Sequence, residues 1–222
     1  MNNSLKCQFL FSFNNDIIKN IFAGYNHPWQ IVPDIKSITE KLISKGLDGY
    51  TLISDGVLIG KNVTISPTSH IGAPCIIGDN TEVRHGAYIR GSVIIGRGCV
   101  IGNSSEIKNS IIMDKAQIPH YNYVGDCVLG EGAHLGAGAI CSNLRTDKGS
   151  VKIHHDGHVI DTGMRKLGAI IGDHVEIGCG SVLCPGTVVG KNTWVYPLTL
   201  VRGSYPADSI IKSDGTVIPR HK

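Results

Sequence analysis

A six-residue repeat dominates this sequence. An isoleucine, valine or methionine recurs at every sixth position from Ile53 to Met113, and a second register of aliphatic residues runs from Ile171 to Val201. Glycine often follows the aliphatic residue, and small residues dominate four positions after it. A period of six matches neither an α-helix nor a simple alternating strand, and it is typical of a parallel β-helix. The repeat therefore predicts an all-β solenoid.

The geometry of such a solenoid limits where a ligand can bind. Each hexad predicts one short strand and one corner, and three hexads close a triangular coil that stacks on the next at about 4.8 Å. The aliphatic side chain points inward, and turn formers such as Asn62 and Asn80 fit the corners. A filled prism has no internal room, so a site lies outside, where enclosure requires a loop or a second prism. We therefore expect a homotrimer with sites between neighbouring prisms.

Composition and charge favour a small-molecule partner. The chain has 222 residues, a formal net charge of +3 and a pI near 8.4, which suit an anionic substrate. It has no basic run and no interleaved aromatic platform, so we expect no nucleic-acid partner. It has no stretch of about 18 apolar residues and no signal-peptide layout in residues 1–13, so we expect no membrane partner and a cytoplasmic location.

The cysteines favour reduced, buried thiols over a disulfide framework or a metal centre. Cys75 and Cys99 occupy the small corner position of the repeat, and no pair has the Cys-x-x-Cys spacing of a zinc site. A buried thiol packs as a small apolar side chain. We therefore expect no metal.

The repeat divides the chain into a central solenoid and two ends. Residues 1–52 lack the hexad and predict a short, mostly helical N-terminal cap over the open edge of the first coil. The β-helix is expected over residues 53–203, interrupted by an excursion loop at 141–168. Histidines at 154–158 indicate a flexible polar loop rather than a metal site. Residues 204–222 form a C-terminal tail.

Four motifs carry more information than the hexad itself. They are AYIRGS at 87–92, IGNSSEIKNS at 101–110, IPHYNYVGD at 118–126 and LGAGAICSN at 135–143. Their order and spacing resemble the acetyltransferase half of the bifunctional glucosamine-1-phosphate acetyltransferase/N-acetylglucosamine-1-phosphate uridyltransferase family. TGMRKLGAIIG at 162–172 is similar to the archaeal-type sugar-1-phosphate nucleotidyltransferase/acetyltransferases. The resemblance implies that the β-helix is left-handed.

The resemblance covers the coils and not the other half of those enzymes. Only about 52 residues precede the coils, without the glycine-rich phosphate loop or the βαβ pattern of a nucleotide-binding domain. We therefore expect acetyl transfer alone. The implied activity is an acetyl-CoA-dependent N-acetyltransferase that acts on the 2-amino group of a hexosamine 1-phosphate.

This reaction requires a base, because the amino group arrives largely as an ammonium ion. A neutral imidazole suits the task, with a gain of about 10²- to 10⁴-fold. His120 follows Pro119 where the main register slips, so we expect it on a protruding bend. The alternative for a single histidine is a solvated loop side chain. The resemblance to the base-bearing motif of the family favours His120 as the general base.

Two cations are placed to bind the phosphate. Arg90 and Lys108 each follow an inward aliphatic residue and are 18 residues apart, which is one complete coil. They are expected to stack on one wall, and two unpaired cations so close suggest an anion between them. The alternative is a pair of surface charges relieved by Glu82 or Glu106. The resemblance assigns the matching positions to the sugar phosphate.

The remaining candidates divide between the acceptor and the cofactor. The acceptor set adds Tyr123 and Asn143, from the resemblance, and Lys152, from its charge. The cofactor set is Cys179 and Gly180 near the thioester, Tyr196 and Pro197 near the adenine, a basic residue of the tail such as Lys212 or Arg220, and Lys166. Arg165 and Lys166 could serve either the acceptor phosphate or the phosphates of coenzyme A (CoA). His134 stands where the family has asparagine, so its role stays open.

Two other functions compete with acetyl transfer. A γ-class carbonic anhydrase-like metalloenzyme would use three zinc-binding histidines, for which His85, His120 and His134 are candidates, although their spacing does not match that family. A non-catalytic partner or regulatory β-helix protein is the second alternative. The choice between glucosamine and galactosamine, and between a 1-phosphate and a nucleotide-linked sugar, stays open.

Overall fold

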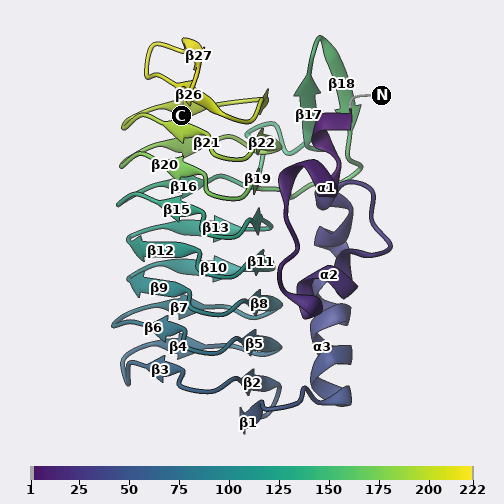
Figure 1. The fold of residues 1–222 in the computed structure, drawn as a ribbon, viewed down its shortest axis with the longest axis vertical. Coiled ribbons are helices and arrows are strands. Elements are labelled where there is room, and N and C mark those ends of the chain that lie inside the picture. Colours follow the sequence, from purple (N-terminus) through teal and green to yellow (C-terminus); the bar gives the residue numbers. More distant parts are fainter. Residues whose placement is uncertain (1–2, 222) are drawn as a thin grey trace.

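The computed structural model describes residues 3–221 and shows the left-handed parallel β-helix that the repeat and the resemblance predicted (Figure 1). Three stacks of short strands form the walls of a triangular prism, and we name them sheets A, B and C. Within the described residues, sheets A and B each contain nine strands and sheet C contains seven.

The strands of each sheet follow one another along the prism. Sheet A contains β1 (Thr51–Ser54), β2 (Val57–Ile59), β5 (Cys75–Ile77), β8 (Val93–Ile95), β11 (Ser110–Ile112), β14 (Val128–Leu129), β19 (Ala169–Ile171), β22 (Thr187–Val189) and β25 (Ser204–Tyr205). Sheet B contains β3 (Thr64–Ile65), β6 (Glu82–Val83), β9 (Val100–Asn103), β12 (Gln117–His120), β15 (His134–Leu135), β20 (Glu176–Ile177), β23 (Trp194–Val195), β26 (Ser209–Ile211) and β27 (Val217–Pro219). Sheet C contains β4 (His70–Ile71), β7 (Tyr88–Ile89), β10 (Glu106–Lys108), β13 (Tyr123–Gly125), β16 (Ile140–Cys141), β21 (Val182–Leu183) and β24 (Leu200–Val201).

Aliphatic side chains of successive coils stack inside the prism. The parallel register places Ile107 between Ile89 and Val124, and all three are fully buried. The same arrangement repeats on the other two walls, so the interior is a column of apolar side chains. Functional groups therefore lie on the outer surfaces and at the corners.

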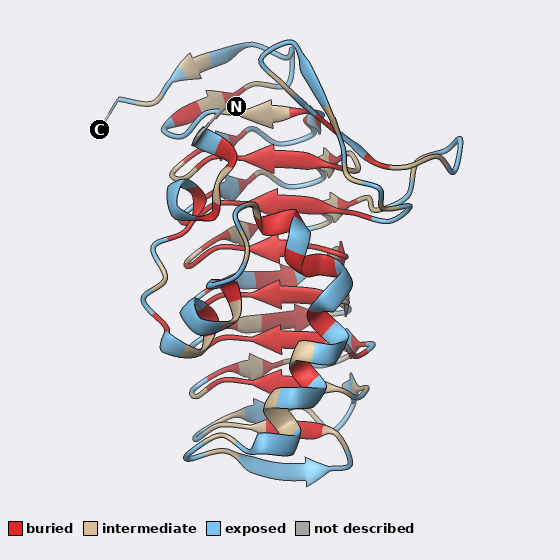
Figure 2. Cartoon of the chain, turned by 90° about the vertical axis from the view of Figure 1, so that its right-hand side faces the viewer, coloured by how far each residue is buried: buried red, intermediate tan, exposed pale blue. Residues whose placement is uncertain are grey.

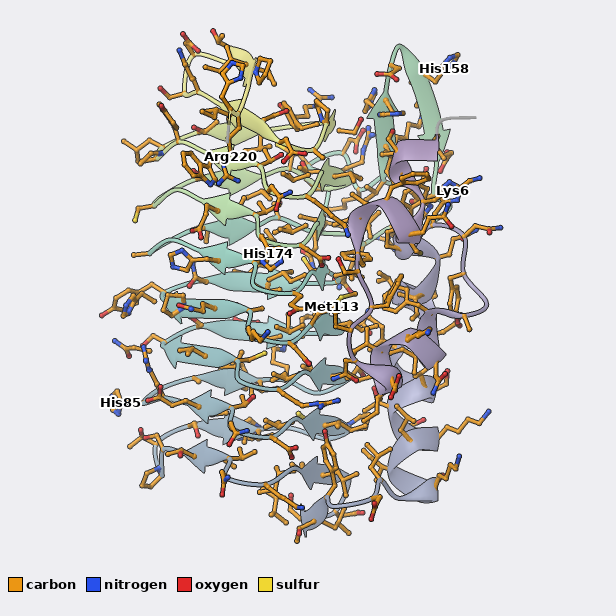
Figure 3. All side chains as sticks on the ribbon, viewed as in Figure 1. Lys6, His85, Met113, His158, His174 and Arg220 are labelled. Carbon is orange, nitrogen blue, oxygen red and sulfur yellow. The ribbon has the colours of Figure 1, made fainter. Side chains whose placement is uncertain are left out.

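The register differs from the expected one near Met113. Ile112 points into the prism in its place, because five residues rather than six separate Ile107 from Ile112. Met113 is buried outside the prism, between the solenoid and the N-terminal segment (Figure 3). Ile118 resumes the six-residue spacing, so the register shortens before β11 and not at His120, where the sequence predicted the slip.

The N-terminal helices pack along the side of the solenoid rather than over the open edge of its first coil (Figure 2). They are η1 (Asn3–Leu5), α1 (Cys7–Leu10), α2 (Asp16–Phe22), η2 (Pro28–Asp34) and α3 (Ile35–Lys45). The outward side chains of sheet A are apolar and buried beneath them: Ile94, Ile111, Val128, Ile170 and Val188. Since the strands of sheet A are apolar on both faces, this wall requires a cover. That requirement explains the difference from the expected end cap.

Short antiparallel strands occupy both ends of the coils. At the first end, β1 pairs antiparallel with β2, and Ile53 is 48% exposed instead of lying in the core. At the other end, the parallel ladders continue through β25 and β26 to Ile211, beyond the expected boundary at residue 203. β27 then pairs antiparallel with β26. The described coils therefore run from Val57 to Ile211.

The excursion forms a β-hairpin rather than a flexible loop. Cys141 still points into the prism, so the departure follows β16. Strands β17 (Lys152–His155) and β18 (His158–Asp161) pair antiparallel. Ile153 is fully buried and packs with the N-terminal helices and the outer face of sheet A. The hairpin is thereby held against the solenoid.

Most of the thiols are buried, as expected, but two are not. All seven cysteines are free, and five of them are buried. Cys179 is exposed and Cys184 is partly exposed. Within residues 3–221, no helix has the length and apolar character needed to cross a bilayer.

Close coil stacking makes one glycine indispensable near the His120 corner. A Cβ atom on Gly102 would lie 1.7 Å from the carbonyl oxygen of Pro119 in the next coil. We expect Gly102→Ala to destabilise the protein by about 1 to 3 kcal/mol, because backbone cannot yield to the added methyl group. Thermal or urea unfolding measures this loss. Gly24→Ala is the matched control, since its Cβ would meet nothing within 4 Å. Equal stability of the two variants would contradict the prediction.

Candidate active site

His120 lies at the corner between sheets B and C. It ends β12 and pairs with Asn103 of β9. The residue is exposed, and within the described part of the chain its imidazole has no hydrogen-bond partner. The strand that carries it is in phase with the repeat, so the corner itself, and not a register slip, brings the ring to the surface. The imidazole is free to accept a proton from a bound ligand.

Asn122 fixes this corner to the next coil. Its side chain is buried, and its Oδ1 accepts a hydrogen bond of 3.0 Å from the backbone N–H of His120. Its Nδ2 donates to the carbonyl oxygens of Gly136 at 2.8 Å and Ala139 at 3.2 Å. The repeat did not identify Asn122. The available signal was an asparagine at the corner position, where the repeat favours small residues.

The same corner continues from His120 to the expected cofactor residues. Backbone N–H groups donate across it from Gly138 to His120, from Gly180 to Ala137 and from Leu198 to Cys179, each with an N–O distance of 2.9 Å. Cys179 therefore lies two coils beyond His120, which is about 10 Å at the usual strand spacing. Tyr196 and Pro197 follow β23 in the next coil and are exposed. The structure thus places Cys179, Gly180, Tyr196 and Pro197 together along one edge.

The tail residues lie near this edge. The Arg220 guanidinium sits 4.1 Å from the centroid of the Trp194 ring. It also donates a hydrogen bond of 2.8 Å to the carbonyl oxygen of Asn192. Arg220 is therefore held on the outer face of sheet B, beside the strand that precedes Tyr196.

Arg90 and Lys108 stack as expected, but neither is unpaired. β7 and β10 are adjacent and in register, so the two cations follow neighbouring strands of sheet C. Arg90 forms an ion pair of 2.9 Å with Glu106, one of the two acids named as alternatives. Lys108 forms an ion pair of 3.2 Å with Asp126. The assumption of unpaired cations is wrong, because each coil brings a carboxylate to the same wall.

Asp126 is the centre of a polar cluster that the sequence analysis did not assign. Its carboxylate is almost fully buried and accepts hydrogen bonds from Lys108, Asn109 and Asn143. The Asn143 amide also donates to the Tyr123 hydroxyl at 3.1 Å. The cluster therefore joins three predicted acceptor-binding residues through one carboxylate. The signal for Asp126 was its position at the end of the IPHYNYVGD motif.

Tyr123 and Asn143 lie over Gly125. A Cβ atom on Gly125 would come within 2.5 Å of the Tyr123 hydroxyl oxygen and 2.8 Å of the Asn143 Nδ2. Burial, together with the negative charges of Asp126 and Glu106, raises the pKa of Tyr123. The phenol therefore stays protonated at neutral pH and can donate a hydrogen bond to a ligand.

Lys152 contributes to a basic pocket beside the later strands of sheet C. This pocket has a volume of about 470 Å³, and its basic lining residues are Arg145, Lys152, His154 and Arg202. Arg145 is paired with Asp147. Within residues 3–221, neither Lys152 nor Arg202 forms an ion pair. We call this cavity the basic pocket.

Arg202 was missed, although the rule that identified Arg90 and Lys108 also applies to it. It directly follows an inward aliphatic residue, Val201, on sheet C.

Lys166 lies apart from the edge that carries Cys179, Gly180, Tyr196 and Pro197, which we call the cofactor edge. It forms a β-bridge with Leu144 and lines a cavity of about 430 Å³ together with Asn109 and Arg165. The next residue donates its backbone N–H to the Asn143 carbonyl oxygen at 3.0 Å. Within one chain, Lys166 is thus beside the Asp126 cluster rather than near Cys179.

Two of the three histidines named for a zinc site, His85 and His134, have other contacts. His85 is hydrogen-bonded to Thr68 at 2.7 Å, and His134 is hydrogen-bonded to Glu176 at 2.7 Å. Within residues 3–221, no group of three histidine, cysteine or acidic side chains is arranged to hold a metal ion. His155 bonds to Ser4 and Ser204, which ties the hairpin to the N-terminal segment and to β25.

The predicted residues thus form two groups on either side of sheet C. His120 and the cofactor edge lie at the corner before its strands, and the Asp126 cluster lies where those strands end. Tyr123, the first residue of β13, reaches from one side toward the other through its contact with Asn143. The arrangement offers a free imidazole, a protonated phenol and several cations on one exposed wall.

Comparisons with known proteins agree with this architecture. The GMPPB C-terminal domain family matches residues 73–164. A bifunctional sugar-1-phosphate nucleotidylyltransferase/acetyltransferase of Sulfurisphaera tokodaii is 35% identical over 188 residues, covering 81% of this chain and 47% of that protein. A putative uncharacterized acetyltransferase of Escherichia coli is 31% identical over 201 residues, covering 81% of this chain and 84% of that protein.

A solved structure shows the same fold. The UDP-N-acetylglucosamine acyltransferase from Campylobacter jejuni aligns with a TM-score of 0.56 at 19% identity, covering 71% of this chain and 60% of that one. The chain spans about half the length of the bifunctional relatives that it matches.

Proposed function

This chain belongs to the family of the acetyltransferase part of the sugar-1-phosphate nucleotidylyltransferase/acetyltransferases, and on that premise we propose that it transfers the acetyl group of acetyl-CoA to the 2-amino group of a hexosamine 1-phosphate. The observation that carries the proposal is the free imidazole of His120 at a corner that continues to the exposed Cys179. A base and a cofactor edge are thereby adjacent on the outside of a filled prism.

The reaction removes two protons from the acceptor nitrogen and exchanges the C–S bond of the thioester for a C–N bond. The neutral His120 imidazole takes a proton from the hexosamine ammonium group, which restores the lone pair of the nitrogen. The amine attacks the thioester carbonyl, a C–N bond forms, and the C–S bond breaks. In going from ammonium to amide the nitrogen gives up two protons: one passes through the imidazolium to the departing CoA thiolate, and the other is released to solvent. No acyl-enzyme intermediate is required.

The acceptor phosphate is assigned to the cations of sheet C. Arg90 is half exposed in its pair with Glu106, so it can exchange this partner for a phosphate at little cost. Lys108 stays fixed by Asp126 and supplies a second donor. Tyr123 and Asn143 face the sugar, and Lys152 adds positive charge from the hairpin. CoA is assigned to the edge formed by Cys179, Gly180, Tyr196 and Pro197, whereas Lys166 goes to the acceptor side.

We further propose a homotrimer. Sheet A is covered by the N-terminal helices, which leaves sheets B and C as the exposed walls. Large apolar side chains project from these walls and their shared corner: Tyr88, Tyr121, Trp194, Leu198 and Leu200. Contact between neighbouring prisms would bury these side chains and enclose the site. Light scattering of the purified chain should give three times its mass of 23.8 kDa.

A thiol-release screen tests the proposed activity. Purified protein is incubated with acetyl-CoA and with glucosamine, galactosamine, their 1-phosphates or their nucleotide conjugates, and free CoA is measured. We expect release only with an amino sugar 1-phosphate. Release with nucleotide conjugates alone would reassign the acceptor, and no release with any of them would favour a non-catalytic role.

The phosphate assignment predicts the effect of Arg90→Ala. Loss of the guanidinium is expected to raise the KM for the sugar phosphate by about tenfold, which corresponds to about 1.4 kcal/mol, and to leave the KM for acetyl-CoA unchanged. Steady-state kinetics with each substrate varied in turn provides the measurement. Arg97→Ala, which removes an exposed arginine from another corner, is the control. An effect confined to acetyl-CoA would refute the assignment.

A further inference from the structure

A second cavity lies on the opposite side of the hairpin from the basic pocket. Its volume is about 720 Å³, which is within the usual range for small-molecule sites. Figure 1 shows the β17–β18 hairpin standing beside the first N-terminal helices. Leu5 and Trp29 line the cavity from the N-terminal segment, and Ile160 and Met164 line it from the hairpin side. We call this cavity the hairpin pocket.

The hairpin pocket combines apolar and aromatic side chains with polar ones, which are Gln30, His155, His158, Asp161 and Thr162. The His27 ring stacks on the Trp29 ring with a centroid distance of 4.5 Å and an interplanar angle of 24°. Burial and the nearby positive charge of Lys6 lower the pKa of His27, so its imidazole is uncharged at neutral pH. A flat ring entering the pocket therefore meets aliphatic side chains and an uncharged aromatic pair.

The described lining of the hairpin pocket lacks the lysine and arginine side chains that would bind an anion. Its described lining residues include no lysine and no arginine, and Asp161 is among them. The pKa of Asp161 is lowered by hydrogen bonds from the Gly163 N–H and the Ser150 hydroxyl, so this carboxylate is ionised at neutral pH. The ionised Asp161 disfavours a phosphate or carboxylate beside it, and no lysine or arginine of the described lining offsets this charge, in contrast to the basic pocket. The two cavities therefore select different ligands.

One strand separates the two cavities. Lys152 and His154 of β17 line the basic pocket, whereas His155 lines the hairpin pocket. The antiparallel register pairs His155 with His158 and Ile153 with Ile160, which places these four side chains on one face of the hairpin. A ligand that packs against Ile160 and His158 thus contacts the same two-stranded unit that positions Lys152.

We propose that the hairpin pocket is an effector site for a flat, uncharged aromatic molecule, and that its occupancy strengthens acceptor binding through Lys152. The kinetic part rests on the proposed function, because it requires a measurable acceptor KM. The binding part does not. A ligand that packs against the hairpin favours the position that the hairpin has in this structure, and Lys152 reaches the acceptor from that position, so the two ligands favour each other's binding.

Indole and its anionic analogue indole-3-acetate test the binding part without any turnover. Saturation-transfer NMR and calorimetry on the full chain are expected to show saturable indole binding with a Kd below about 1 mM, and binding of indole-3-acetate at least about tenfold weaker. Equal binding of both probes, or no saturable indole binding, would overturn the proposal.

Two tryptophan substitutions on β18 localise the site. Ile160→Trp fills the pocket and is expected to weaken indole binding by at least about tenfold. Val159→Trp adds a similar volume on the opposite face, at a side chain that is 56% exposed, and should change the Kd by less than about twofold. Loss of binding in Val159→Trp alone, or in neither variant, would place indole elsewhere and overturn the assignment.

The kinetic part is tested with the acceptor that the thiol-release screen identifies. Saturating indole should lower the acceptor KM by about two- to fivefold in the unmodified chain and leave it unchanged in Ile160→Trp. Indole binding without any change in acceptor KM would overturn the effector role. Absence of turnover with every acceptor would instead refute the proposed function and leave the binding result standing.

Discussion

Replacement of His120 by alanine is expected to lower kcat for acetyl transfer by about 10²- to 10⁴-fold. The reason is that the acceptor amine stays protonated when no imidazole is present to take its proton. His120 is exposed, and its side chain has no partner within residues 3–221, so the fold should be unaffected. Steady-state kinetics gives kcat, and thermal unfolding of the same preparation checks the fold.

His85→Ala is the matched control for this experiment. His85 lies at the same corner of an earlier coil, where the backbone N–H of Ser104 donates to its carbonyl oxygen. Its removal deletes an exposed imidazole that bonds to Thr68 and should leave kcat within about twofold of the original value. A His120→Ala protein with unchanged turnover would remove His120 from the mechanism. An equal loss in both variants would indicate a general effect of altering this edge.

The six-residue repeat was sufficient to predict that Arg90 and Lys108 lie next to each other on one wall. Because three hexads make one coil, residues 18 apart occupy equivalent places, and the structure puts these two residues on neighbouring strands. Asp126, the partner of Lys108, is also 18 residues further along, but this coil has only 17 residues, so Asp126 lies one place beyond Gly125, the register partner of Lys108. The pairing was not predictable from the period because the repeat does not show where a coil is shortened. The repeat therefore predicts which residues share a wall, whereas the ion pairs on that wall depend on the number of residues in each coil.

The position of the N-terminal helices also had a signal in the sequence. Ile94, Ile111 and Val128 each precede an inward aliphatic residue of sheet A, so this wall is apolar on both faces. Equivalent outward positions on sheet C include Glu106 and Tyr123, which tolerate solvent or a ligand. The contrast between walls predicts which one is covered. The repeat alone does not reveal it, since the inward positions are similar on all three walls.

Other features depend on geometry that the period does not encode. The shortened spacing between Ile107 and Ile112 turns Met113 outward, and two adjacent isoleucines in the sequence fit either register. The hairpin at β17 and β18 lies outside the repeat altogether, so the two cavities that it separates were not predictable. The family resemblance, and not the period, singled out His120 and Cys179, and the structure brings both to one corner of the coils.

Asp126→Ala is expected to cause the largest loss of stability among these variants. The substitution removes the ion-pair partner of Lys108, whose side chain is only 19% exposed, and removes an acceptor of both Asn109 and Asn143. Leaving a largely buried charge without its partner costs about 3 to 5 kcal/mol. For a chain of this size, that loss lowers Tm by about 6 to 20 °C. Thermal unfolding followed by circular dichroism measures the shift.

Glu106→Ala provides the comparison, because it breaks the ion pair with Arg90 on the same wall where both side chains are substantially exposed. An exposed pair contributes at most about 1 kcal/mol, so its Tm should move by only a few degrees, about 2 to 4 °C. If Asp126→Ala is no less stable than Glu106→Ala, the Asp126 cluster does not hold this wall together.

The double variant Lys108→Met/Asp126→Ala separates stability from substrate binding. Removing both charges leaves no unpaired ion, so it should recover most of the Tm lost in Asp126→Ala. Acceptor binding should not recover, because Lys108 is the second cation assigned to the phosphate and Asn143 has lost its carboxylate partner. Recovery of Tm together with a normal acceptor KM would show that the cluster is structural only. A recovered Tm with a raised acceptor KM would show that the Lys108–Asp126 pair serves acceptor binding in addition to its part in the stability of this wall.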